Sequence, residues 1–564
     1  MLAALVIFIY ILFTLWAYGR GFLALLGRKR TQPIEISVPF VLLLGLMVVT
    51  TLGSFASIFI RLNWEFQTGL FLGTVILVIV GIVHHSSFPR LSMKNFSLLQ
   101  KISLALFCIS ALTILYASTL TPANADTGIY HAQTIHWIES YPVVPGLVNL
   151  QPRLGYDSSW LLANAIFSLS FLNIQSFHLL TGVFFFIMAA YFYSGVHELL
   201  AKKYQLSNFL KLGFFLSIFV FLFDQVSSPG TDAPATLLVW FLLTQTVQLL
   251  ESRQPADDPE YAFVVFLTFF CITIKVSSAP LLLLALGIVI LLIAAKKYRE
   301  IGWMALGGVI LLLPFITRNL ILTGYPVFPG FPVDLFNFDW KLPLEKVREE
   351  SLEIHWFATL SNMPQSEFDR LSWRDQTIQW YANLLPRQKA ILLFIVVSFA
   401  LNGLLCAFKG WRSFIAHYFG FWSVYLTAIF GCVFWFISAP AFRFGYGFLL
   451  AAVFLLGGTF LLFILEKSAL LKKFTGYLVV VVCVVVIGVS LKPQIKLNKV
   501  ASTLLLPADY PSWSSQPCSF ANFKLLCQVD YDSCWYSPFP CAISGNDQVE
   551  MRGEDYREGF RHIQ

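Results

Sequence analysis

Short charged clusters divide most of the sequence into long apolar runs. Most runs have about 18–25 residues, the length of an α-helix that crosses a lipid bilayer. Only 12% of the residues are charged, about half the ~25% of soluble domains, which excludes a soluble enzyme, a nucleic-acid-binding protein and a disordered chain. We therefore predict an all-α polytopic membrane protein, a helical bundle of about 14 transmembrane helices. The predicted spans are 2–19, 36–60, 67–84, 102–119, 176–198, 207–224, 233–250, 261–275, 279–295, 302–317, 388–407, 413–437, 446–465 and 474–491.

Lysine and arginine in the short loops predict the orientation of the chain, because cytoplasmic loops carry an excess of both. Loops on one side of the predicted bundle hold most of them, whereas the short loops on the other side hold only Arg61, Lys275 and Arg443. The cation-rich side is therefore predicted to be cytoplasmic. Both termini and three long segments are then expected on the periplasmic face of a bacterial inner membrane. These segments are 120–175, 318–387 and 492–564.

One further apolar stretch, 157–172, is not counted as a span. Counting it would reverse the orientation of every later loop and contradict the distribution of cations. We predict that it forms a helix that lies in, or dips into, the outer membrane interface.

Four of the nine cysteines lie close together in the segment after the last predicted span. An even number of cysteines outside the membrane indicates disulfides, and four cysteines allow three pairings. Zinc is the competing interpretation, but no C-x2-C pair occurs, so we favour disulfides and a small disulfide-linked tail. The four residues are Cys518, Cys527, Cys534 and Cys541.

The first long segment contains residue types suited to acid–base chemistry. Asp126 follows closely after a predicted span and precedes Tyr130 and His131. It either caps a helix through 129–139 or acts as a carboxylate that accepts a proton from an incoming nucleophile. Asp232, at the outer start of a later span, either stabilises that helix terminus or faces the same site.

Cations recur at the outer ends of predicted spans, where the orientation rule makes them uncommon. Lys275, Arg318 and Arg443 occupy such positions. They either extend toward lipid headgroups or together bind a lipid phosphate, as arginine does with two parallel hydrogen bonds and lysine as a point charge. No Asp, Glu, Lys or Arg lies clearly at the middle of a span and no P-loop occurs, which disfavours an ion-coupled transporter and an ATP-driven pump.

Several of these stretches occur together in a recognisable order. A long outer loop carries an Asp followed by a Tyr-His pair, a second Asp opens a later span, and R-N-x-x-x-T-G-x-P-x-x-P ends another. This arrangement resembles the GT-C superfamily, polytopic glycosyltransferases that take sugars from polyprenyl-phosphate carriers. The likeness is closer to a group of uncharacterised bacterial polytopic membrane proteins related to that superfamily. It is carried by the stretches DTGIYHAQTIHW, VPGLVNLQPRLGYDSSW, SAPAFRFGYGF and MRGEDYREGF.

The topological likeness covers about 102–465, which we expect to be a GT-C-like transmembrane core. Accessory transmembrane helices are expected in 1–101, a last transmembrane helix in 466–491 and an outer tail in 492–564.

The resemblance implies roles for three of the candidate residues. Asp126 takes the place of the catalytic carboxylate, Asp232 that of the second loop acid, and Arg318 that of the arginine near the carrier phosphate. The metal requirement is open, and a divalent cation is the candidate cofactor. Residues expected near the site without an assigned role are Tyr130, His131 and Arg153.

The expected function is transfer of a sugar or glycan from a polyprenyl-phosphate-type lipid to an acceptor on the outer face. Asp126 would deprotonate the acceptor, which is a glycan, a lipid or a protein. The alternative is a transporter or flippase of lipid-linked glycans, which would need polar residues along a route through the bilayer. The expected partners are the lipid-linked sugar, the acceptor and membrane lipids, with no nucleic acid.

Overall fold

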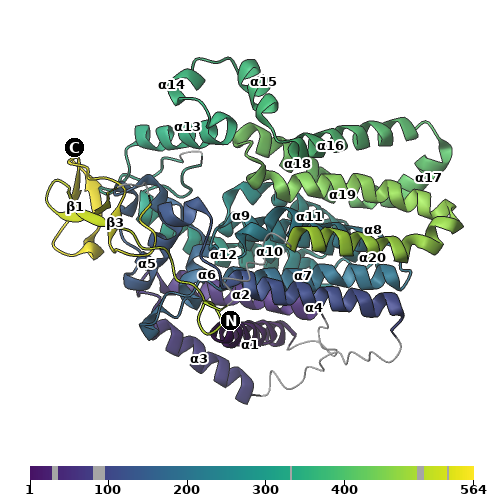
Figure 1. Cartoon of the computed structure of the whole chain (residues 1–564), viewed down its shortest axis with the longest axis horizontal. Coiled ribbons are helices and arrows are strands. Elements are labelled where there is room, and N and C mark those ends of the chain that lie inside the picture. Colours follow the sequence, from purple (N-terminus) through teal and green to yellow (C-terminus); the bar gives the residue numbers. More distant parts are fainter. Residues whose placement is uncertain (28–35, 81–95, 331–332, 492–500, 530–532, 564) are drawn as a thin grey trace.

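The computed structural model describes residues 1–27, 36–80, 96–330, 333–491, 501–529 and 533–563 as a helical bundle with a small β-containing tail (Figure 1). Among these residues, eleven helices are long and apolar enough to cross a membrane, as expected of a multi-pass membrane protein. They are α1 (Leu2–Gly27), α2 (Val38–Ala56), α4 (Leu98–Ser118), α7 (Leu180–Leu200), α8 (Leu206–Ser217) with η6 (Ile218–Leu222) and η7 (Phe223–Gln225), α9 (Asp232–Glu251), α11 (Leu282–Ala294) with η8 (Val276–Leu281), α12 (Tyr298–Thr323), α16 (Pro386–Leu405), α19 (Phe442–Lys467) and α20 (Ala469–Leu491).

Three predicted spans coincide with shorter apolar helices of 16 or 17 residues. These are α3 (Trp64–Ile79), α10 (Pro259–Ile274) and α18 (Trp422–Ser438). Within the described residues, every predicted apolar run therefore falls on helical segments; residues 81–84 of the run 67–84 lie outside the described residues. Whether these three shorter helices also cross the membrane stays a prediction.

The stretch 157–172 forms helix α6 (Ser159–Phe167), but its surroundings differ from the prediction of an interfacial helix. All nine residues of α6 are buried, and Trp160, which is fully buried, packs edge-on against Phe184 of α7. Protein rather than lipid therefore encloses this helix, because the segment is apolar around its whole circumference instead of on one face.

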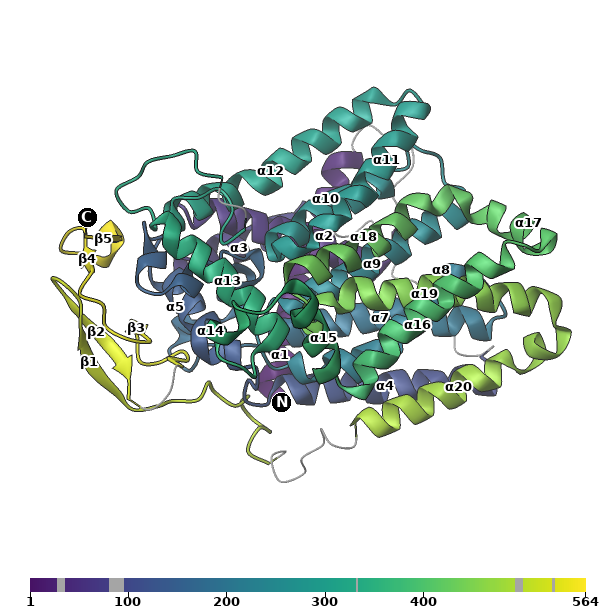
Figure 2. The ribbon, with the colours of Figure 1, turned by 90° about the horizontal axis from the view of Figure 1, so that it is seen from above.

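The long segments gather at one end of the bundle, which we call the loop end (Figures 1 and 2). Arg153 of the first segment pairs with Glu353 of the second at 3.0 Å, and the Phe560 amide of the tail donates to Pro145 O at 3.0 Å. These contacts are consistent with the expectation that the three long segments lie on one side of the membrane. The elements of the first two segments are η2 (Thr127–His131), α5 (Ala132–Ser140), η3 (Leu147–Asn149), η4 (Pro152–Gly155), η5 (Ser170–Leu172), α13 (Leu344–Leu360), α14 (Gln365–Phe368) and α15 (Trp373–Asn383); α17 (Lys409–Tyr418) and η9 (Phe419–Phe421) connect α16 to α18.

The part of the tail that the structure describes contains two small sheets and two disulfides. Strands pair in the order β1-β2-β3, with β1 and β2 antiparallel and β2 and β3 parallel, and β4 pairs antiparallel with β5. The disulfides join Cys518 to Cys527 and Cys534 to Cys541, which confirms the predicted disulfide-linked tail and selects one of the three pairings. The elements are β1 (Ser515–Ser519), β2 (Lys524–Gln528), β3 (Cys541–Ala542), β4 (Val549–Met551), η10 (Tyr556–Glu558) and β5 (Phe560–His562).

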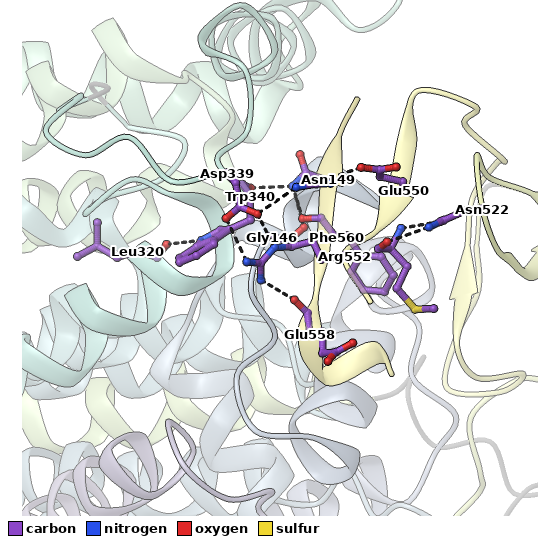
Figure 3. Close-up of polar contacts among 12 residues, drawn as sticks. Gly146, Asn149, Leu320, Asp339, Trp340, Asn522, Glu550, Arg552, Glu558 and Phe560 are labelled. Atoms are coloured by element: carbon purple, nitrogen blue, oxygen red, sulfur yellow. Dashed lines mark hydrogen bonds and ion pairs between the residues drawn. The ribbon is translucent and has the colours of Figure 1, made fainter. Parts of the chain in front are cut away.

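A polar junction joins the tail to both other long segments (Figure 3). Arg552 forms a two-pronged contact with Asp339, with Nε–Oδ2 at 2.8 Å and Nη2–Oδ1 at 3.1 Å. The Asn149 amide donates to Trp340 O at 2.9 Å and to Phe560 O at 3.1 Å. Because one buried amide bridges the second segment and the tail, the three segments form a single packed unit at the loop end.

Candidate functional site

Asp126 lies where the chain leaves α4 and enters η2, but its side chain does not cap that helix. Asn124 takes the capping position instead, since its Oδ1 accepts from the Asp126 amide at 2.9 Å and its carbonyl accepts from Thr127 N at 3.0 Å. The predicted helix through 129–139 is present as η2 and α5. The Asp126 carboxylate is thus left for an interaction outside its own turn.

Four charged side chains predicted from the sequence meet at the loop end, and we call them the charged tetrad. Arg443 Nη2 lies 3.0 Å from Asp126 Oδ2, and Arg443 Nε lies 3.6 Å from Asp232 Oδ2. Lys275 Nζ forms an ion pair with Asp232 Oδ1. Both cations also contact the ring of Phe444, with Lys275 Nζ 3.9 Å from its centroid. Carboxylates and cations therefore alternate along the tetrad in one connected network.

Helix ends bring the tetrad together. Asp232 is the first residue of α9, and Lys275 follows the last residue of α10 in an extended conformation. Helix α19 begins at Phe442, directly after its N-cap residue Ala441, so Arg443 lies in the first turn of that helix. Charged groups at helix ends can reach water at the edge of an apolar bundle, whereas the same groups at mid-helix would be enclosed by apolar side chains.

A cavity of about 460 Å³ opens beside the tetrad, within the range of about 300–1,000 Å³ that holds small ligands. Asp232 and Arg443 line it, and their side chains are 13% and 37% exposed. The other walls come from α13, α15, α16, η6 and η7, with further residues of α9 and α19. Two members of the tetrad, Asp232 and Arg443, are therefore accessible from a space that can hold a substrate.

Sequence reasoning missed two charged residues of the cavity wall, Asp224 and Arg387. Both are exposed. Asp224 ends a predicted span and Arg387 directly precedes another on the cation-poor side, so the argument that selected Lys275 could have found them. They were overlooked because each was assigned to the edge of an apolar run.

Tyr130 and His131 pack beside the tetrad; His131 is buried and Tyr130 is partly buried. Their rings lie 4.3 Å apart. Burial lowers the pKa of His131 to about 4, although the carboxylates of Asp126 and Asp232 act in the opposite direction. Burial also raises the pKa of Tyr130 well above its usual value. Both side chains are therefore uncharged at neutral pH and form a low-dielectric wall next to Asp126.

Arg153 lies in η4, and its guanidinium pairs with Glu353 of α13 through Nη2 at 3.0 Å. Next to it, Tyr156 donates a hydrogen bond to Glu350, whose pKa is raised by burial. These contacts hold α13 against η4. Arg153 thus helps to fix a wall of the cavity, because Phe357 and Thr359 of the same helix line it.

Arg318 lies apart from the tetrad. Its side chain is 4% exposed, and each of its three guanidinium nitrogens donates to protein: Nε and Nη2 donate to Asp157 Oδ1 at 3.1 and 3.0 Å, and Nη1 donates to Ser57 Oγ at 2.6 Å. The structure therefore does not bring Arg318 to the cavity, and this geometry gives no support to the predicted contact with a carrier phosphate.

The part of the chain that the structure describes contains no group of three or more His, Cys, Asp or Glu side chains that could hold a metal ion. In the tetrad, the two carboxylates face the cations of Arg443 and Lys275. The divalent cation considered from the sequence accordingly stays a prediction.

Apolar helices and a charged cavity at one end of the bundle define a multi-pass membrane protein with a polar site at its loop end. The chain belongs to the family described as "Domain of unknown function (DUF8201)", whose model matches residues 1–450. The matched region includes the whole tetrad and ends before the tail. Comparisons with curated proteins and with solved structures found no match. The resemblance to the GT-C superfamily is thus a prediction from the sequence.

Proposed function

We propose that the protein is a membrane glycosyltransferase that moves a sugar or glycan from a polyprenyl-phosphate-type carrier to an acceptor at the loop end, on the periplasmic face. The observation that carries this proposal is the tetrad beside the cavity of about 460 Å³. A carboxylate and a cation that lie together at the edge of an apolar bundle suit a reaction between a donor held in lipid and an acceptor arriving from water.

In the proposed reaction, Asp126 is the general base. Arg443 engages Asp126 through Oδ2, so the other carboxylate oxygen is available to accept the proton of the acceptor hydroxyl. The acceptor oxygen forms a bond to the anomeric carbon of the sugar. The bond from that carbon to the carrier phosphate oxygen breaks, and the phosphate leaves with the electron pair.

Arg443 is the group proposed to stabilise the leaving phosphate. It is the most exposed member of the tetrad, with 37% of its side chain accessible, and it lines the cavity. Lys275 supports Arg443 indirectly, because both cations form ion pairs with the Asp232 carboxylate. Charge that develops on the phosphate would therefore meet a cation already fixed by two acids and an aromatic ring.

Arg443→Ala should weaken retention of polyprenyl phosphate by about tenfold or more, because a hydrogen bond to a charged group contributes roughly 1.5–3 kcal/mol. The measurement is the amount of carrier lipid that copurifies or binds in nanodiscs, determined by mass spectrometry. Arg61→Ala is the matched control, since Arg61 pairs with Glu65 in the first turn of α3 and is half exposed. Equal lipid retention by wild type and Arg443→Ala would refute the assigned role of Arg443.

A further inference from the structure

The second disulfide of the tail closes a loop that contacts the helix carrying Asp126. We call residues 534–541 the clamp loop, because Cys534 and Cys541 are joined. Trp535 N donates to Gly128 O at 2.8 Å. The Trp535 ring lies so close to Gly128 that a Cβ there would be 2.7 Å from it. Gly128 is two residues after Asp126, so this contact is made in the same turn as the proposed base.

Gln133, one turn further along, is held by the clamp loop at both ends of its side-chain amide. Its Nε2 donates to Trp535 O and Pro538 O, each at 2.9 Å, and its Oε1 accepts from Cys541 N at 3.2 Å. Gln133 is 1% exposed. A buried amide with several backbone partners fixes the relative position of the two segments, since releasing it would leave buried polar groups unpaired.

The same face of α5 makes two more contacts with the clamp loop. The His136 ring stacks on Tyr536 and Phe539, with centroids 4.1 and 3.8 Å away. The Tyr536 hydroxyl donates to Glu139 Oε2 at 2.5 Å, and burial raises the pKa of Glu139 to about 7. Gln133, His136 and Glu139 recur every three residues, so one face of the helix is covered by the loop.

The conformation of the clamp loop depends on its surroundings. Trp535 adopts a left-handed backbone conformation, with φ of 51°, which is unusual for a bulky side chain and persists where neighbouring contacts impose it. The other disulfide, Cys518–Cys527, joins β1 to β2, which already pair along a ladder from Ser515 to Gln528. Among the described residues of 534–540 no strand occurs.

We propose that the clamp loop, closed by Cys534–Cys541, is a positioning element for Asp126, so that an oxidised tail is required for the site to be assembled. Reduction of this disulfide would enlarge the conformational freedom of the loop and release the turn from Asp126 to Gln133. Assembly of the site is thereby coupled to an oxidising compartment. The inference rests on the proposed function only for the role of Asp126.

The test compares two disulfide variants of the full chain in nanodiscs by hydrogen exchange and by glycan transfer. In Cys534→Ser/Cys541→Ser, amides in 124–140 should exchange about tenfold or more faster, because local opening becomes easier. The turnover rate should fall by about tenfold to a hundredfold, with carrier retention unchanged. The matched control, Cys518→Ser/Cys527→Ser, should keep both exchange in 124–140 and turnover close to wild type.

Gln133→Leu provides a second variant if the serine pair fails to fold, because it keeps both disulfides and removes only the amide contacts. It should raise exchange in 124–140 in the same way. Unchanged exchange in both clamp variants, or an equal increase in the control pair, would overturn the inference. If wild type shows no transfer, the proposed function fails, and the exchange measurement still decides whether the clamp loop orders this segment.

Discussion

Asp126→Asn should fold and reach the membrane as the wild type does, yet transfer glycan about a hundredfold more slowly or worse, the usual scale for a lost acid–base group. Asparagine has nearly the same size and cannot accept the proton of the acceptor. The side chain of Asp126 caps no helix, so the substitution removes no capping bond. The measurement is the initial rate of transfer from a polyprenyl-phosphate-linked sugar by purified protein.

Asp334→Asn is the matched control for this prediction, because Asp334 is an exposed acid of the second long segment that pairs with Lys341. It should transfer at the wild-type rate. A near-normal rate for Asp126→Asn would assign the base elsewhere, and Asp232, the other acid of the tetrad, would be the next residue to substitute.

Arg318→Ala should lower the free energy of unfolding by about 3–5 kcal/mol, because removing one partner of a buried ion pair leaves the other charge uncompensated. Asp157, with 5% of its side chain exposed, would lose its cation inside the bundle, and Ser57 would lose its donor. Retention of polyprenyl phosphate should not change. Thermal or denaturant unfolding in nanodiscs, together with the lipid assay, checks both parts.

A double variant separates loss of the ion pair from loss of packing at this position. Arg318→Met/Asp157→Leu should recover much of the stability, since apolar residues of similar volume can replace a buried pair. Arg61→Ala, in an exposed pair, should change stability by less than about 1 kcal/mol. If Arg318→Ala instead loses the lipid at normal stability, the phosphate contact predicted from the sequence is right and the structural role is wrong.

The helices were the part of the fold most accessible from the sequence. Apolar runs bounded by charges predict helices directly, because a buried or lipid-facing backbone must satisfy its hydrogen bonds within the segment. The sequence was less informative about 157–172. Its apolar composition suits a lipid interface as well as a protein interior, and the burial of all nine residues of α6, with Trp160 packed on Phe184, distinguishes them.

Three members of the tetrad were predictable because they lie at span ends where few charges occur. Asp232, Lys275 and Arg443 stand out against apolar neighbours on the cation-poor side. The sequence does not give their mutual distances, so the pairing of Arg443 with both acids required the structure.

The same limit explains why the partner of Arg318 was not predicted from the sequence. Its position at a span end matched that of Lys275, but its partner, Asp157, is 161 residues away and belongs to a segment interpreted as interfacial. The contacts of the tail could not be predicted from the sequence either, since Gln133 and the clamp loop are about 400 residues apart in the chain. Partner choice over such separations depends on helix packing, which local pattern does not encode.

The most direct test of the account is an experimental structure of the oxidised protein with a polyprenyl phosphate bound in nanodiscs. The account predicts the phosphate in the cavity lined by Asp232 and Arg443, within hydrogen-bonding distance of the Arg443 guanidinium, with Asp126 next to the space left for the sugar and acceptor. Binding of the phosphate at Arg318 would contradict the account. So would binding at the opposite end of the bundle, or at any other place away from the tetrad.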